Sequence, residues 1–175
     1  MLTDSAALDD VLQTHAAALG KDFDGYRNHA YRVMNLCHAL SPSADRDKIA
    51  LAAAFHDLGI WTAGTFDYIP PSAQLATTHL AAAGPSSWTA EIETTIKEHH
   101  KLSRYRPHPD WLVEPFRKAD LIDVSRGVVT FGLPRRLIAD LFAQWPSAGF
   151  HKRLVQLSLT RLRTHPFSPL PMVRL

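Results

Sequence analysis

Apolar residues recur along this chain at the three-to-four residue spacing of an amphipathic α-helix. The clearest stripe contains Tyr26, His29, Val33, Leu36 and Leu40, which this spacing places on one helix face. We find no sustained alternation of apolar and polar residues and no Asn-Gly hairpin signal. The pattern therefore predicts an all-α fold, a single-domain bundle of several helices.

Turn and capping residues divide this pattern into segments. Pro42 breaks the helix that carries the first stripe, Asp45 can cap the next helix, and Gly59 is expected to end it. Helices are expected over about residues 5–19, 25–40, 45–59, 72–84, 89–101, 110–124 and 148–163. We expect one domain over residues 1–165, followed by a proline-rich tail, residues 166–175, extended along the surface.

A segment rich in turn-forming and aromatic residues separates two of the expected helices, between Trp61 and Ser72. It is long enough to form a lid over a substrate, and an ordinary surface loop explains it equally well. Trp61, Phe66 and Tyr68 can stack on a base or cover a pocket, or they can fill the core. Both interpretations stay open at this point.

Composition narrows the class of protein. The chain has 175 residues, 46% of them hydrophobic, and a formal net charge of +2. This charge is too small to indicate nucleic-acid binding, although phosphate-bearing small molecules remain compatible. The apolar runs are too short to cross a membrane, and the oligomeric state is left open. Cys37 is the single cysteine and no signal-peptide pattern precedes it, so a cytoplasmic location is expected.

Histidine and aspartate residues stand at positions that helical spacing turns toward the core. His29 lies on the first stripe, the pair His56-Asp57 lies within FHDLG, and Asp120 follows Phe116 by four residues. An ionised carboxylate that faces a core is costly unless a partner neutralises it. Each residue alone fits an ordinary core histidine or an ion-paired aspartate. Together they indicate a site for a divalent metal.

Four short motifs follow one another in a characteristic order: HAYRV, AFHDLG, EHHK and RKADLID. Their order and spacing, from about Tyr26 to Val124, resemble the HD domain superfamily of metal-dependent phosphohydrolases. The resemblance implies an all-helical bundle with a metal site at its centre. It further implies one or two divalent ions, with Mn, Fe, Zn, Ni, Co or Mg as candidates.

The resemblance also assigns roles to individual residues. It makes His29, His56, Asp57 and Asp120 metal ligands, with Asp57 also catalytic, either between two ions or orienting the attacking water. Asp123, one turn beyond Asp120, is expected to contact a metal ligand without binding the metal itself, or to cap the helix.

Histidines for a second metal, or for the pocket beside it, are expected between the doublet and the last aspartate. His99 and His100 stand where binuclear members of the superfamily place such ligands. His79 falls near the place of another, without a motif to support it, and a partly exposed helix position explains it as well.

Three cationic residues are candidates to bind phosphate. Arg32 lies one turn from His29, where the superfamily often has arginine, and Lys101 and Arg104 follow the double histidine. Each can equally be a solvent-exposed surface charge. The chain departs from the HDxGK subgroup, since it has Ile60 in place of the lysine.

These features predict a metal-dependent phosphohydrolase that uses a metal-activated water on a nucleotide or other small phosphate ester. A diiron oxygenase acting on a small organic substrate is one alternative. It would use His29, His56, Asp57, His79, His99 or His100, and Asp120. A hydratase for small nitriles such as cyanamide and a non-catalytic, metal-stabilised module are weaker alternatives.

Overall fold

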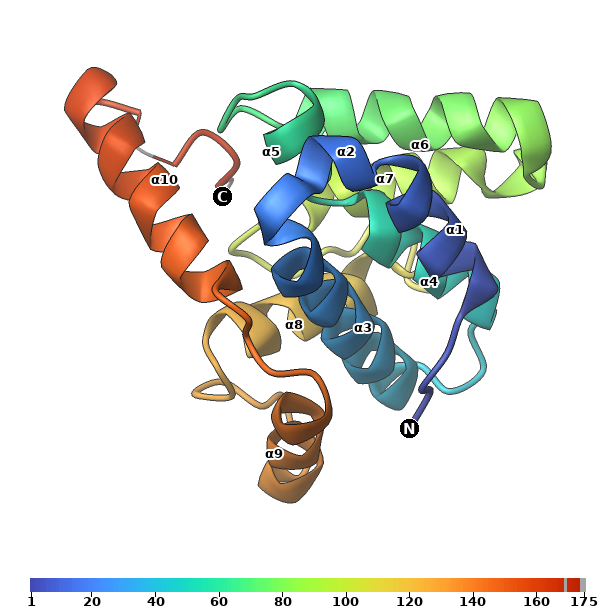
Figure 1. Cartoon of the computed structure of the whole chain (residues 1–175). Helices are drawn as coiled ribbons and strands as arrows, with labels where there is room; N and C mark the ends of the chain where they lie inside the picture. Colours follow the sequence, from blue (N-terminus) through green and yellow to red (C-terminus); the bar gives the residue numbers. More distant parts are fainter. Residues whose placement is uncertain (169, 174–175) are drawn as a thin grey trace.

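Helices are the only regular elements in the described part of the chain, residues 1–168 and 170–173 of this computed structural model (Figure 1). They are α1 (Ala6–Thr14), α2 (Ala16–Leu19), α3 (Phe23–Leu40), α4 (Arg46–Phe55), α5 (Gly59–Thr62), α6 (Ile69–Ala83), α7 (Thr89–Glu98), α8 (Val113–Val124), α9 (Arg135–Gln144) and α10 (Phe150–Thr164). Two short 3₁₀ turns cover Gly20–Asp22 and Ser86–Trp88. The prediction of an all-α, single-domain bundle is confirmed.

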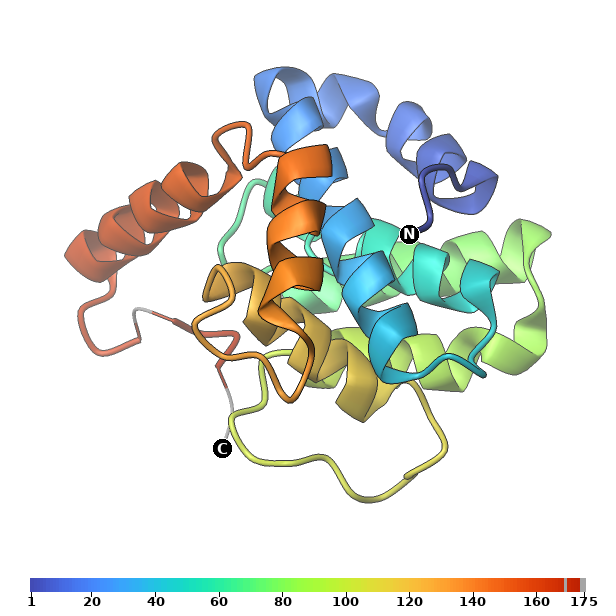
Figure 2. The same cartoon turned by 90° about the horizontal axis from the view of Figure 1, so that it is seen from below.

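Helix α3 lies at the centre of the bundle. It packs against α8 and α4, while α6 and α7 lie side by side and close the next layer (Figures 1 and 2). Residues 29–37 of α3 are all buried, as expected for a helix that has neighbours on every side. Polar residues on this stretch must therefore find partners inside the protein, which places any chemistry they carry at the bundle centre.

Gly59 begins a helix and does not end one, so the expected helix end at this residue is wrong. Helix α4 stops at Phe55, and Gly59 opens the short α5. The Gly59 N–H donates to Ser72 Oγ at 2.8 Å, and a Cβ on Gly59 would lie 2.5 Å from the Tyr68 carbonyl oxygen. The glycine is thus required by the close approach of α6, which begins at Ile69, earlier than expected.

Helix α9 was not among the helices expected from the sequence. This helix buries Ile138 and Leu141 and is followed by Trp145, whose ring stacks on Tyr31 at 5.3 Å between centroids. The spacing of Ile138 and Leu141 and the preceding Pro134 are the signals that could have identified it.

Helix α10 extends away from the bundle, and the tail after it returns toward α5 (Figures 1 and 2). Met172 is buried and packs with Ile60, Phe66, Tyr68 and Ile69. This part of the tail therefore packs against the bundle, whereas an extended surface segment was expected. The proposed domain end at residue 165 stays a prediction, and residues 169, 174 and 175 lie outside the described part. Among the described helices, none has an apolar stretch long enough to cross a bilayer.

Candidate metal centre

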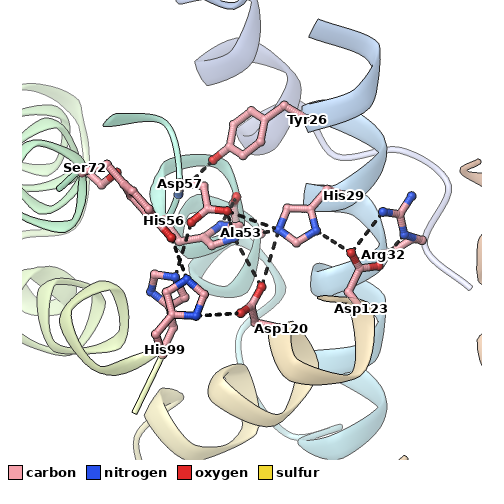
Figure 3. A network of polar contacts seen from close by, with 12 residues as sticks. Tyr26, His29, Arg32, Ala53, His56, Asp57, Ser72, His99, Asp120 and Asp123 are labelled. Atoms are coloured by element: carbon pink, nitrogen blue, oxygen red, sulfur yellow. Dashed lines mark hydrogen bonds and ion pairs between the residues drawn. The ribbon is translucent and has the colours of Figure 1, made fainter. Parts of the chain in front are cut away.

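Four side chains from three separate parts of the sequence meet at the centre of the bundle (Figure 3). His29 comes from α3, Asp120 from α8, and His56 and Asp57 from the turn after α4; all are at most 2% exposed. The Nε2 atoms of His29 and His56 are 2.9 Å apart. Asp57 Oδ2 lies 3.7 and 3.5 Å from these two nitrogens, and Asp120 Oδ1 lies 3.6 and 3.8 Å from them.

The two imidazoles direct lone pairs at each other. His56 Nδ1 lies 2.8 Å from the Ala53 carbonyl oxygen, so it must carry the proton and donate, which leaves Nε2 an acceptor. His29 Nδ1 likewise donates to Asp123 at 2.6 Å. Burial lowers the pKa of His56 to about 3, which keeps that ring neutral. Two ligands about 2.1 Å from one ion and at right angles would lie about 3.0 Å apart, so the observed spacing suits a shared cation.

The end of α4 allows two neighbouring residues to face the same point. Consecutive helical residues point about 100° apart, but Asp57 lies beyond the last helical residue, Phe55. Tyr26 Oη holds this turn, because it accepts the Asp57 N–H at 3.2 Å and donates to the Ala54 carbonyl at 2.9 Å. The doublet thus converges because the helix stops there.

A second group of donors shares Asp57 with the first. His99 Nε2 lies 3.4 Å from Asp57 Oδ1, and its Nδ1 donates to a backbone carbonyl at 2.7 Å. His100 Nδ1 lies 3.5 Å from Asp120 Oδ2, while its Nε2 lies 2.6 Å from Tyr68 Oη. The donor sets His29-His56-Asp57 and Asp57-His99-His100 are each compact enough to hold an ion.

Several of these buried atoms have no hydrogen-bond partner: Asp57 Oδ1, Asp120 Oδ1 and His99 Nε2. Buried polar atoms are normally paired, so cations held by the two donor groups would supply the partners that these three atoms lack. Burial raises the pKa of Asp120 to about 7 against the opposing effect of His99. Burial acts in the same direction on Asp57, but His56 and His99 outweigh it and hold the pKa of Asp57 well below its usual range. Imidazole and carboxylate donors together fit Mn, Fe, Co, Ni or Zn better than Mg.

Arg32 does not take the phosphate-binding position expected for it. It is fully buried, its Nε and Nη2 bind the two oxygens of Asp123, the latter at 3.1 Å, and its Nη1 donates to the Trp145 carbonyl at 2.7 Å. The guanidinium is therefore occupied inside the protein. It fixes Asp123, which in turn fixes His29 (Figure 3).

His79 also lies away from the cluster. Its ring contacts Phe55 at 5.3 Å between centroids and lines a separate hollow with His15. The reason is the register of α6, which directs this residue toward α4 and α1 and away from Asp57. The expectation that His79 joins the second metal group does not fit this placement.

A cavity of about 460 Å³ opens onto the cluster at Asp57, His99, His100 and Asp120. Lys101 lines this cavity, whereas Arg104 is exposed on the following loop.

Aromatic and cationic residues complete the cavity wall. Phe66 and Tyr68 line it, whereas Trp61 packs on Tyr26 with ring centroids 4.8 Å apart. Arg117, which was not among the residues expected at the site, also lines the wall. The i, i+3 spacing of Glu114 and Arg117, which form an ion pair at 2.9 Å, is the signal that could have drawn attention to it.

Comparisons with known proteins agree with this geometry. The family model described as the HD domain matches residues 26–126, more than half of the chain. No curated protein and no solved structure gives a significant match. The matched residues contain the histidines and aspartates of both donor groups. The chain therefore belongs to the HD domain family.

Proposed function

We propose that this protein is a metal-dependent phosphohydrolase that acts on a nucleotide or another small phosphate ester. The observation that carries the proposal is the pair of donor groups joined through Asp57 at the end of an open cavity. Membership of a family made up largely of metal-dependent phosphohydrolases supports it. The single cysteine, Cys37, is free and buried, which suits the cytoplasmic location that we propose.

Each donor side chain is assigned to one of two metal ions in this proposal, and Asp57 to both. His29, His56, Asp57 and Asp120 would hold the first ion, and His99 and His100 would hold a second with Asp57. A divalent ion bound there would lower the pKa of a water molecule enough for attack on phosphorus near neutral pH. Asp57, between the two groups, would orient that water through its carboxylate.

Hydrolysis forms a P–O bond to the water oxygen and breaks the P–O bond to the alcohol, which leaves with a proton. Tyr68 Oη bonds to His100 Nε2 at the cavity wall. In this proposal the pair would supply the proton to the leaving oxygen. Lys101 lines the same cavity and would offset the negative charge of the phosphate.

A diiron oxygenase is the second candidate, because six side chains in and beside the cluster could act as ligands for two iron ions. Although His79 lies elsewhere, both His99 and His100 approach the two carboxylates. With His29, His56, Asp57 and Asp120 they complete a six-residue set. Iron content and O2 consumption separate this candidate from hydrolysis.

Protein purified without chelators tests the proposal directly. Its metal content is measured, and release of phosphate is followed over a panel of phosphate esters and nucleotides. We expect bound Mn, Fe, Co, Ni or Zn and hydrolysis that is lost in Asp57→Ala. Hydrolysis that persists in a metal-free Asp57→Ala protein contradicts the proposal.

A further inference from the structure

The cavity that opens onto the cluster is polar at one end and apolar along the rest of its wall. Most of the apolar wall comes from three segments, represented by Leu121 and Val124 of α8, Val155 and Leu159 of α10, and Met172 and Val173 of the tail. We propose that the substrate is a phosphate monoester of an aliphatic alcohol, whose hydrocarbon body lies along this wall. This inference rests on the proposed phosphohydrolase activity and narrows its substrate class.

The exposure of the wall indicates that a ligand covers it. Val155 and Leu159 are 58% and 51% exposed although they line a cavity. Helix α10 extends away from the bundle (Figures 1 and 2), and its Val155 and Leu159 line the hollow without filling it. Adjacent apolar groups that stay in water gain free energy when another apolar surface covers them. The donor cluster lies at one end of the same hollow and would bind the phosphate. A single amphiphilic molecule can therefore contact both the cluster and the apolar wall.

The charge of the wall disfavours nucleoside polyphosphates. Lys101 and Arg117 are the cationic side chains on the described wall. The guanidinium of Arg117 is held by Glu114, with two contacts of 2.9 Å. Two or three linked phosphates call for several cations, whereas a monoester bound at a metal site needs fewer.

The hydrogen-bonding capacity of the wall disfavours a nucleobase. Beyond the cluster and Tyr68, Ser158 is the one uncharged polar side chain on the described wall. Pockets that recognise a base do so with several convergent donors and acceptors. A volume of about 460 Å³ lies within the range of small-molecule sites and has room for an alkyl chain beside the phosphate.

The test measures chain-length dependence with the full-length, metal-loaded protein. Initial rates are compared for methyl, butyl, hexyl and octyl phosphate and for adenosine monophosphate. We expect kcat/KM to rise about fourfold per methylene until the cavity is full, and octyl phosphate to exceed the nucleotide. A flat series, or a preference for the nucleotide, overturns the inference.

A binding measurement keeps this inference distinguishable from the proposed activity. No turnover of any ester, p-nitrophenyl phosphate included, counts against the proposed function itself. Calorimetric titration with n-alkylphosphonates, which resist hydrolysis, then reads the preference of the cavity alone. Affinity that grows with chain length supports an amphiphilic ligand, and affinity that is independent of chain length overturns it.

Variants of the exposed wall complete the experiment. Leu159→Gln and Val155→Thr keep side-chain size but place a polar group on the wall, and exposed positions tolerate such changes with little loss of stability. We expect Leu159→Gln to lower kcat/KM for octyl phosphate about tenfold more than for methyl phosphate. Gln156→Ala, exposed on the same helix and outside the wall, is the matched control. Equal effects on both substrates contradict the assigned role of the wall.

Discussion

His29 and Asp123, which are 94 positions apart in the sequence, are joined by a 2.6 Å contact between imidazole Nδ1 and a carboxylate oxygen. Both side chains are fully buried. Because Asp123 accepts the Nδ1 proton, His29 presents its Nε2 lone pair to the cluster. The Arg32 guanidinium also donates hydrogen bonds to the carboxylate of Asp123. The contact thus connects a buried ion pair to a proposed metal ligand.

Asp123→Asn is expected to weaken metal binding about 10- to 100-fold, because a neutral amide orients His29 less firmly and lowers its basicity. Titration of the apoprotein with Mn or Zn measures the change. Asp140→Asn, at an exposed position of α9, serves as the control. Unchanged affinity in folded Asp123→Asn protein contradicts the supporting role of Asp123.

Arg32→Lys is expected to destabilise the protein by about 3 kcal/mol, because an ammonium cannot reproduce the contacts to both oxygens of Asp123 and to the Trp145 carbonyl. Urea unfolding measures the loss. In Arg27→Lys, which alters a partly exposed pair with Asp9, a loss below about 1 kcal/mol is expected. A raised KM for a phosphate ester with unchanged stability would instead support the phosphate-binding role that was expected for Arg32 from the sequence.

Gly59→Ala is expected to cost about 2 kcal/mol or more, because the new Cβ meets backbone atoms at the start of α6 that cannot rotate away. Gly64→Ala has open space around it but a φ of +61°, so a loss of about 1 kcal/mol is expected there. Thermal unfolding compares the two variants. Equal stabilities would show that the close approach of α6 is not limiting.

Tyr68→Phe is expected to lower kcat about tenfold while KM changes little, because it removes the hydroxyl that bonds to His100 and keeps the ring packed with Met172. Steady-state kinetics on a phosphate ester gives both parameters. Tyr105→Phe, outside the cavity wall, is the control. A change confined to KM would place Tyr68 in substrate packing alone.

Helical spacing was sufficient to bring the central residues together. His29 and Asp120 lie on stripes that face the core, and His56-Asp57 follows an alanine-rich helix, so their approach needs only that the helices pack. The family resemblance placed His99 and His100 beside them. The ligand roles of these residues remain predictions that the geometry supports.

The errors concern partners that are distant in the sequence. The sequence around Arg32 is compatible with a guanidinium that binds a substrate and with one that binds a protein carboxylate. The carboxylate that it does bind, that of Asp123, is 91 residues away and could not be identified from this local pattern. The approach of α6 to Gly59 and the return of Met172 onto Tyr68 are likewise tertiary contacts. The spacing of residues along one helix does not show which distant segment will pack against it, so contacts of this kind could not be predicted from the sequence.

Anomalous diffraction from crystals of the Mn-loaded protein locates a bound metal independently of any activity. We expect a peak bonded to the Nε2 atoms of His29 and His56 and to the carboxylates of Asp57 and Asp120. A fully loaded protein whose only peaks lie outside this cluster would contradict the proposed metal centre.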